Sequence, residues 1–195
     1  MARPREFDRE EVLAEAIKVF ADHGFGGTST DALLKAMGIS RQSMYDTFGD
    51  KRRLYLEALQ RYSARSVSEI IRSLNTGPSP LKGLEAALVA FASRPRAETA
   101  LGCMGVSSTC EFGRSDPEVA VANDVSARTL QAALERVIAE GKASGEVGSN
   151  VDVRTAAQFI GVTLSGMKVA ARGGVSAGTL RDIARMAIRS LGVGR

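Results

Sequence analysis

The sequence predicts an all-α protein. Apolar residues recur at helical spacing along almost all of the chain, and no segment shows the alternation that is typical of strands. Alanine, leucine, arginine and glutamate recur throughout, and all four favour helices. The 195 residues suffice for one sizeable domain, or for a small domain joined to a larger one.

The first helix is predicted to begin after Asp8. Asp8 is a suitable N-cap, and Glu11 follows three residues later to complete a capping box. "HGFGG" ends the helix, since glycine adopts backbone angles that terminate helices. The buried face of this helix is predicted to consist of Val12, Leu13, Ala16, Ile17 and Phe20.

Two short helices follow in "TSTDALLKAMG" and "ISRQSMYDTFG". We expect Thr28 or Thr30 to cap the earlier helix and Gly38 to end it. Ser40 should cap the later helix. Two short helices joined by a glycine-containing turn, behind a longer supporting helix, predict a helix-turn-helix. The inward face of the later helix is predicted to consist of Ile39, Met44 and Phe48.

A fourth helix should begin after Asp50 and run to about Leu74. "NTGPSP", residues 75–80, is the clearest break in the chain, because glycine and proline favour turns. Further helices are predicted at about 80–93, 101–113, 117–142, 152–172 and 176–191.

The order of these N-terminal motifs is specific. A capped helix ends in "GF", a threonine opens a short helix, "GIS" precedes a helix with a YxxF spacing, and Lys51 begins a long helix. This combination resembles the TetR/AcrR family of one-component transcriptional repressors. The resemblance implies nine helices, with a helix-turn-helix DNA-binding domain over 1–49. It also implies a ligand-binding and dimerisation domain over 50–195, with the helix from about residue 50 connecting the two.

The same resemblance implies a homodimer whose last two helices, within about 152–191, pack as a four-helix bundle. The partners it implies are a double-stranded, pseudo-palindromic DNA operator and a small-molecule effector. We therefore expect a repressor that a ligand releases from its operator. A helical protein–protein adaptor is the alternative, and an enzyme is a distant third.

Charge alone does not predict DNA binding. The net charge of the chain is +4, but residues 1–61 hold ten cations and ten acids and are neutral overall. A DNA-binding role must therefore depend on where the charges lie, and not on a general attraction to polyanions.

The outward side chains of the second short helix suit base recognition. Arg41 and Gln42 occupy its first turn, where a recognition helix touches bases, and they can bind the edges of guanine and adenine. Ser43 is a shorter candidate. The alternative for all three is an ordinary solvated face.

Phosphate contacts are expected from other residues of this region. Tyr45 is an outward aromatic side chain with a hydroxyl, and Lys51 is a cation in a first helical turn. Thr28 and Ser40 lie at helix N-termini, which attract anions. In the N-terminal arm, a pair of arginines either enters the minor groove or stays solvated; these are Arg3 and Arg5.

The later part of the chain offers candidates for an effector site between helices. For each of them, core packing is the alternative. The segments around 101–113 and 156–167 hold few charges, which favours a small lipophilic effector. Cys103 is either a small packing residue or a redox or electrophile sensor. The predicted ligand contacts are Phe91, Cys103, Met104, Phe112, Phe159 and Met167.

Several functional classes are disfavoured. His23 is the only histidine, and the two cysteines form no metal-binding cluster, so neither a metal site nor a cofactor is expected. No nucleophile–base motif or phosphate-binding loop is present. No apolar run is long enough to span a membrane, and the N-terminus is not of the signal-peptide type, so a soluble, cytoplasmic protein is expected.

Overall fold

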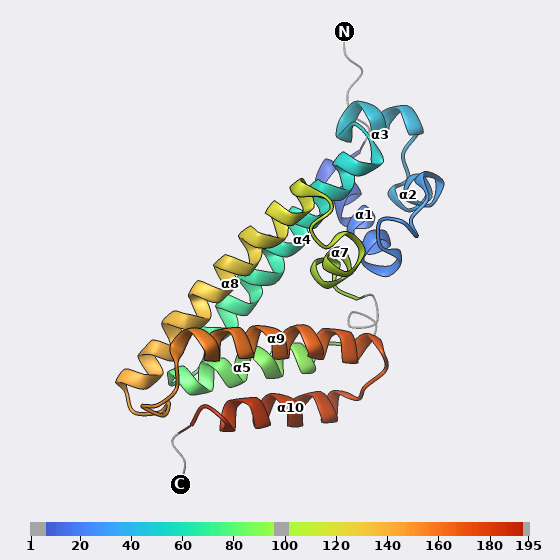
Figure 1. Ribbon diagram of the computed structural model, residues 1–195. Helices are drawn as coiled ribbons and strands as arrows, with labels where there is room; N and C mark the ends of the chain where they lie inside the picture. The colour runs from blue at the N-terminus through green and yellow to red at the C-terminus, as the bar shows by residue number, and fades with distance from the viewer. Residues whose placement is uncertain (1–6, 96–101, 193–195) are drawn as a thin grey trace. The chain divides into compact units, whose positions relative to one another are not determined.

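The computed structural model describes residues 7–95 and 102–192. Within these ranges the chain forms nine helices and one isolated antiparallel bridge, between Val147 and Gly192 (Figure 1). The predicted all-α class is confirmed. The helices are α1 (Arg9–His23), α2 (Thr30–Met37), α3 (Arg41–Phe48), α4 (Lys51–Leu74), α5 (Pro80–Ala92), α7 (Met104–Phe112), α8 (Pro117–Ala143), α9 (Val153–Arg172) and α10 (Ala177–Arg189).

The N-caps of the first helices follow the sequence signals, with one correction. Asp8 accepts the backbone N–H groups of Glu10 and Glu11 at the start of α1, as predicted. For α2 the predicted caps, Thr28 or Thr30, are wrong. The cap is Ser29, whose hydroxyl accepts the N–H of Ala32 at 3.1 Å.

Thr28 is unavailable as a cap because its side chain points into the fold. Its hydroxyl donates to the carbonyl oxygen of Gly24 at 2.5 Å, and the residue is only 2% exposed. Thr30 is the first residue of α2 itself. A run of three hydroxyl residues therefore has its middle member as the cap.

The turn between α2 and α3 depends on a glycine. Gly38 has a φ of +65° in the left-handed region, where a side chain would be strained. Its N–H donates to the carbonyl oxygen of Leu34 and ends α2. Ser40 then caps α3 by accepting the N–H of Ser43 at 3.1 Å, as predicted.

The described residues form two compact units. Of the described residues, the first unit holds those within Met1–Ser63 and Cys103–Asn123, and the second those within Ala64–Gly102 and Asp124–Arg195. Helices α4 and α8 each contribute residues to both units. The boundary predicted between residues 49 and 50 concerns function, not compactness, and it stays a prediction.

The first unit has its own core. Residues from α1, α2, α3, α4 and α7 and from the start of α8 contribute buried apolar side chains to one cluster. At its centre Phe20 and Tyr55 meet edge to face, with ring centroids 5.0 Å apart. Phe112 of α7 lies 5.6 Å from both Tyr55 and Phe25. A helix far along the chain therefore helps to build the core beneath α1–α3.

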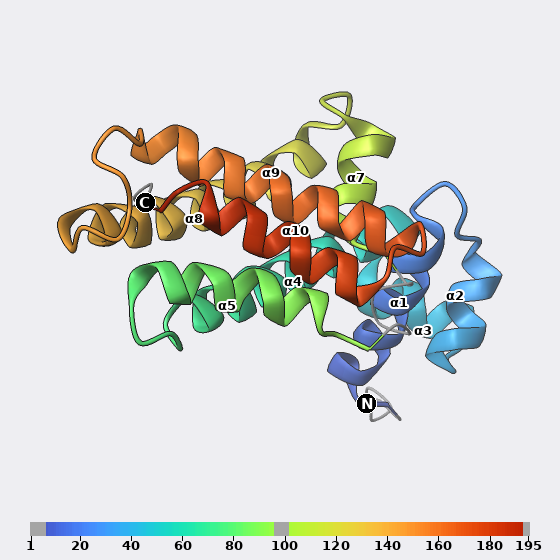
Figure 2. The ribbon, with the colours of Figure 1, turned by 90° about the horizontal axis from the view of Figure 1, so that it is seen from below.

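The second unit is held by a larger apolar cluster. Its buried residues come from the end of α4 and from α5, α8, α9 and α10, and they include Leu84, Ile160 and Leu180. Figures 1 and 2 both show α5, α9 and α10 side by side, and α10 packs against both of its neighbours. Glu146 also holds the start of α5, accepting the Ser79 hydroxyl at 2.7 Å and the Leu81 N–H at 3.1 Å.

Candidate nucleic-acid interface

Helix α3 has one buried and one exposed face. Met44 is fully buried and Phe48 nearly so, and they anchor α3 in the first unit. Arg41 and Gln42 are exposed, as is Tyr45 with 45% of its surface. The division between inward and outward residues agrees with the one predicted from their spacing.

Both predicted base-reading side chains have an acidic partner. The Arg41 guanidinium donates through Nη2 to Asp31 Oδ1 of α2 at 2.6 Å. The Gln42 amide donates through Nε2 to Asp46 Oδ1 at 2.8 Å. The spacing of four residues between Gln42 and Asp46 is visible in the sequence. The pairing of Arg41 with Asp31 crosses the turn and was not anticipated.

Polar groups also gather at the start of α3. The hydroxyls of Ser40 and Ser43 lie 2.9 Å apart, and Ser43 is half-buried. The first N–H groups of a helix lack partners within it and carry a partial positive charge, so they favour anions. This end of α3 is therefore suited to a phosphate as well as to base edges.

Lys51, the predicted phosphate contact, begins α4 and is half-buried. Its ammonium group lies over the ring of Phe25, 4.2 Å from the centroid. Asp50 caps α4 by accepting the N–H of Arg53 at 2.8 Å, as predicted. The aromatic ring restricts where the lysine charge can lie, which positions the charge beside the turn that follows α1.

The remaining predicted DNA contacts fall elsewhere. Thr28 is buried and its hydroxyl is bonded within the fold, so the residue supports the turn before α2. Arg3 and Arg5 lie outside the described residues. These contacts stay predictions.

Glu111 of α7 was missed by the sequence analysis. Its carboxylate accepts the backbone N–H of Phe25 at 2.9 Å and that of Gly26 at 2.5 Å. Hydrogen bonds from N–H groups to an ionised carboxylate are stronger than neutral ones. One side chain of α7 thereby holds the turn between α1 and α2. No local signal reveals this, since 86 residues separate Phe25 from Glu111.

Arg52 makes a second set of long-range contacts in the first unit. Its guanidinium lies 2.9 Å from Asp116 and 2.5 Å from Glu118, at the start of α8. The backbone N–H of Val119 lowers the pKa of Asp116, and Arg52 lowers it further by favouring the ionised form. Glu57, on the same helix as Arg52, pairs with Arg9 of α1 at 2.6 Å.

A small polar group is enclosed between α4, α7 and α8. Burial raises the pKa of Tyr55 well above its ordinary value, so its hydroxyl stays protonated. The buried Ser108 hydroxyl donates to the carbonyl oxygen of Gly105 at 2.9 Å and lies 3.0 Å from Asn123 Oδ1. These satisfied polar groups fix how α7 packs against the core.

Two family comparisons bear on this arrangement. Residues 12–58 match the family described as bacterial regulatory proteins, tetR family. Residues 77–187 match the family described as tetracyclin repressor-like, C-terminal domain, which is more than half of the chain. The chain belongs to the TetR family.

Individual TetR-family relatives match most of the chain. The regulator YezE of Bacillus subtilis, an uncharacterized HTH-type transcriptional regulator, is 34% identical over 82% of this chain and 84% of its own length. The HTH-type transcriptional repressor ComR of Escherichia coli is 28% identical, over 96% of this chain and 90% of its own.

Solved TetR-family structures share the fold. A cysteine mutant of the regulator CifR, complexed with a 26-base-pair double-strand operator DNA, has a TM-score of 0.83 at 27% identity. The match covers 96% of this chain and 99% of that one. This chain is thus a DNA-binding transcriptional regulator of the TetR family and not an enzyme, as the sequence predicted.

The six predicted effector contacts of this TetR-family chain are not gathered in one place. Phe91 and Met167 belong to the apolar cluster of the second unit. Met104 and Phe112 pack in the core of the first unit, where Cys103 is the half-buried N-cap of α7. Phe159 is 44% exposed on α9. Their role in binding an effector stays a prediction.

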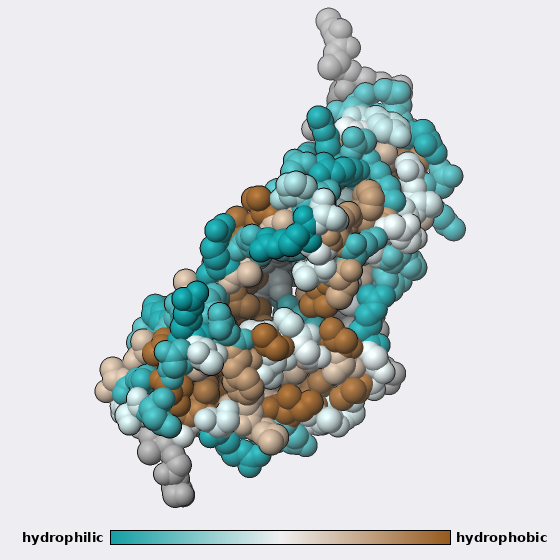
Figure 3. Space-filling model, viewed as in Figure 1, coloured by the Kyte–Doolittle hydropathy of each residue, from teal (hydrophilic) through white to brown (hydrophobic). Residues whose placement is uncertain are grey.

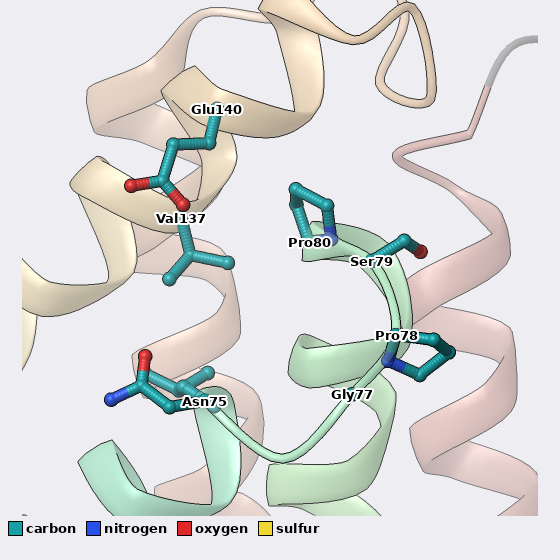
Figure 4. A pocket seen from close by; sticks show the side chains of 8 residues that line it. Asn75, Gly77, Pro78, Ser79, Pro80, Val137 and Glu140 are labelled. Atoms are coloured by element: carbon teal, nitrogen blue, oxygen red, sulfur yellow. The ribbon is translucent and has the colours of Figure 1, made fainter.

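A separate pocket lies in the second unit, where the chain turns from α4 into α5. Its volume is about 280 Å³, and Figure 4 shows the turn that carries Gly77, Pro78, Ser79 and Pro80 opposite Val137 and Glu140 of α8. None of the predicted effector contacts lines this pocket. The Arg136 guanidinium donates to two lining residues, to Asn75 Oδ1 at 3.2 Å and to Glu140 Oε1 at 2.8 Å.

Helices α9 and α10 carry exposed apolar side chains, and brown patches mark part of this surface at the lower end of Figure 3. The α9 members recur at intervals of three and seven residues, so they share one side of the helix. We call this set the α9–α10 apolar face: Phe159, Val162, Val169, Ile183 and Met186.

The described residues contain no group of three or more histidine, cysteine, aspartate or glutamate side chains arranged to hold a metal ion. Within the same ranges, every helix is too short or too polar to cross a membrane.

Proposed function

We propose that this TetR-family chain is a homodimeric repressor that a small lipophilic effector releases from a pseudo-palindromic operator in the cytoplasm. The observation that carries the proposal is helix α3, which is anchored by Met44 and Phe48 and exposes Arg41, Gln42 and Tyr45. A helix of this kind suits the major groove, where arginine and glutamine can distinguish base pairs. The repressor role of ComR supports the same direction of regulation.

The DNA-binding part of the proposal is tested by comparing two substitutions in a gel-shift series. Arg41→Ala should weaken binding and relax the preferred sequence, because Arg41 would touch bases. Lys51→Ala should weaken binding on every sequence and flatten its dependence on salt, because Lys51 would touch a phosphate. If Arg41→Ala changed neither affinity nor sequence preference, α3 would not be the recognition helix.

The homodimer is proposed to form through the α9–α10 apolar face. Val162 is 72% exposed and Met186 69%, although both are apolar and lie on helices whose other sides are buried. Gly166 of α9 adds no side chain and has open space above it, so another helix could approach closely there. A second copy of the same face would bury these side chains and set two α3 helices for successive major grooves.

The lipophilic character of the effector is inferred from the apolar residues around 156–167 and 101–113. Glu111 is the only charged residue of these two segments, and its carboxylate already accepts the backbone N–H groups of Phe25 and Gly26. Operator release should be compared in gel shifts between a panel of neutral lipophilic compounds and a panel of sugar phosphates. Release by sugar phosphates alone would contradict the lipophilic assignment.

Helix α7 offers a way for the effector to act on DNA binding. Met104, a predicted effector contact, and Glu111, which holds the turn after α1, lie on this one helix. A ligand that favours a displaced α7 would withdraw the Glu111 carboxylate from Phe25 and Gly26. The ligand must bind that state better than the operator-binding state if it is to shift the balance.

A further inference from the structure

Both acidic partners of the predicted base-reading side chains, Asp31 and Asp46, are exposed. Asp31 is 83% exposed in its side chain and Arg41 55%, and an exposed ion pair contributes little to stability. Asp31 also lies in the first turn of α2, where a negative charge interacts favourably with the helix dipole. That role does not require Arg41, yet the Arg41 guanidinium lies 2.6 Å from the Asp31 carboxylate.

Arg41 and Gln42 can each still bind a base while they are bonded to their acidic partners. A guanidinium has five N–H donors, and Asp31 accepts from Nη2, so donors remain for the O6 and N7 atoms of guanine. Each acid therefore restrains its partner without blocking it.

The restraint on Gln42 also fixes the direction of its amide. A carboxylate only accepts hydrogen bonds, so the Nε2 atom must face Asp46. The carbonyl oxygen and the second N–H of Gln42 then remain available, and these are the two groups that pair with adenine.

The negative charges of Asp31 and Asp46 should also weaken binding to non-specific DNA. A free arginine at a DNA interface binds the phosphates of any sequence, and this attraction supplies most non-specific affinity. A carboxylate beside the arginine repels the same phosphates and competes with them. Together with the neutral overall charge of residues 1–61, this favours contacts to bases over contacts to the backbone.

We propose that Asp31 and Asp46 are specificity-determining residues, which hold Arg41 and Gln42 for base recognition and keep them from phosphates. This inference rests on the proposed function of α3 as a recognition helix. Both acids weaken the general attraction to DNA, but they would help the protein to select its operator.

The test measures the affinities of wild type and Asp31→Asn for two duplexes at several salt concentrations. One duplex is selected by the wild type from a random pool, and the other is its shuffled sequence. We expect Asp31→Asn to bind the shuffled duplex more tightly and its ratio of specific to non-specific affinity to fall about five-fold. Asp46→Asn should act in the same direction.

Glu15→Gln is the matched control. It removes the same charge from the first unit, but Glu15 pairs with Lys18 within α1. Its affinity ratio should equal that of the wild type. An equal change in the ratio for Glu15→Gln and Asp31→Asn would overturn the inference, since net charge alone would then explain the effect.

A double-mutant comparison separates positioning from other roles of Asp31. In an Arg41→Ala background, Asp31→Asn should no longer alter the affinity ratio, because its partner is absent. Persistence of the full effect there would overturn the inference, as would an unchanged ratio in the single variant. If the wild type selects no duplex at all, the proposed function fails as well, so the two failures are distinguishable.

Discussion

Both units have an apolar core, but in the first unit charged side chains also tie distant parts of the chain together beside α3, whereas the second unit leaves apolar side chains exposed on α9 and α10. Glu111 and Arg52 connect α7 and α8 to the region that presents α3. In the second unit α5, α9 and α10 share buried apolar residues and leave an apolar face exposed. The orientation of the turn before α2 therefore depends on single charged side chains as well as on buried area.

Truncating a buried aromatic residue of the first unit should destabilise the fold far more than truncating an exposed one of the second. Phe20 is fully buried, so Phe20→Ala should lower the free energy of unfolding by about 3–5 kcal/mol. Phe159→Ala should cost less, and its cost should depend on protein concentration if the side chain is covered only in a dimer. Urea unfolding at several protein concentrations provides the measurement.

A charge on the α9–α10 apolar face should break the assembly without unfolding the subunit. Val162→Glu is expected to give a monomer in light scattering and to lower operator affinity about 100-fold, because two linked half-site contacts become one. Val121→Glu, at a position of α8 that is 61% exposed, is the control. A dimeric Val162→Glu protein would place the interface elsewhere.

Each unit has a glutamate that accepts at least one backbone N–H group from a distant segment. Glu111 holds backbone N–H groups beside the helix-turn-helix, and Glu146 holds the start of α5. Each substitution to glutamine should cost about 1 kcal/mol of stability.

Operator affinity, measured by gel shift, should differ between these two variants. Glu111→Gln should also lower operator affinity, because the turn before α2 is released. Glu146→Gln should leave operator affinity unchanged. Equal affinities for the two variants would mean that Glu111 only stabilises the fold.

The stability of the first unit should depend weakly on pH through Asp116. The folded chain lowers the pKa of Asp116, so its ionised form stabilises the fold above the unfolded pKa of about 3.9. This contribution is lost as the pH falls through the folded value. The stability difference between wild type and Asp116→Asn should therefore be constant from about pH 7 to 5 and shrink below about pH 4. A difference that grew on acidification would contradict the role of the Arg52–Asp116 pair.

Local features of the fold could be predicted from the sequence because their causes are local. Asp8, Ser40 and Asp50 cap helices through N–H groups two or three residues away. The inward positions of Met44 and Phe48 follow from helical spacing. The same arguments placed the outward residues of α3.

The rest depends on contacts that sequence spacing does not encode. Glu111 lies far along the chain from Phe25, and Arg52 is similarly far from Asp116. Even the choice of Ser29 as a cap required a tertiary detail. Thr28 is engaged with the Gly24 carbonyl, which only the folded turn brings within reach.

The packing of Phe112 against Tyr55 and Phe25 has a consequence for how the protein is made. Helices α1–α4 leave the ribosome before α7 does, so the aromatic core beneath α3 still lacks Phe112 at that stage. Closing it requires a contact between residues distant in sequence, which is slow compared with helix formation. We expect nascent chains to acquire operator binding only after α7 has emerged, so that an incomplete polypeptide does not compete for the operator.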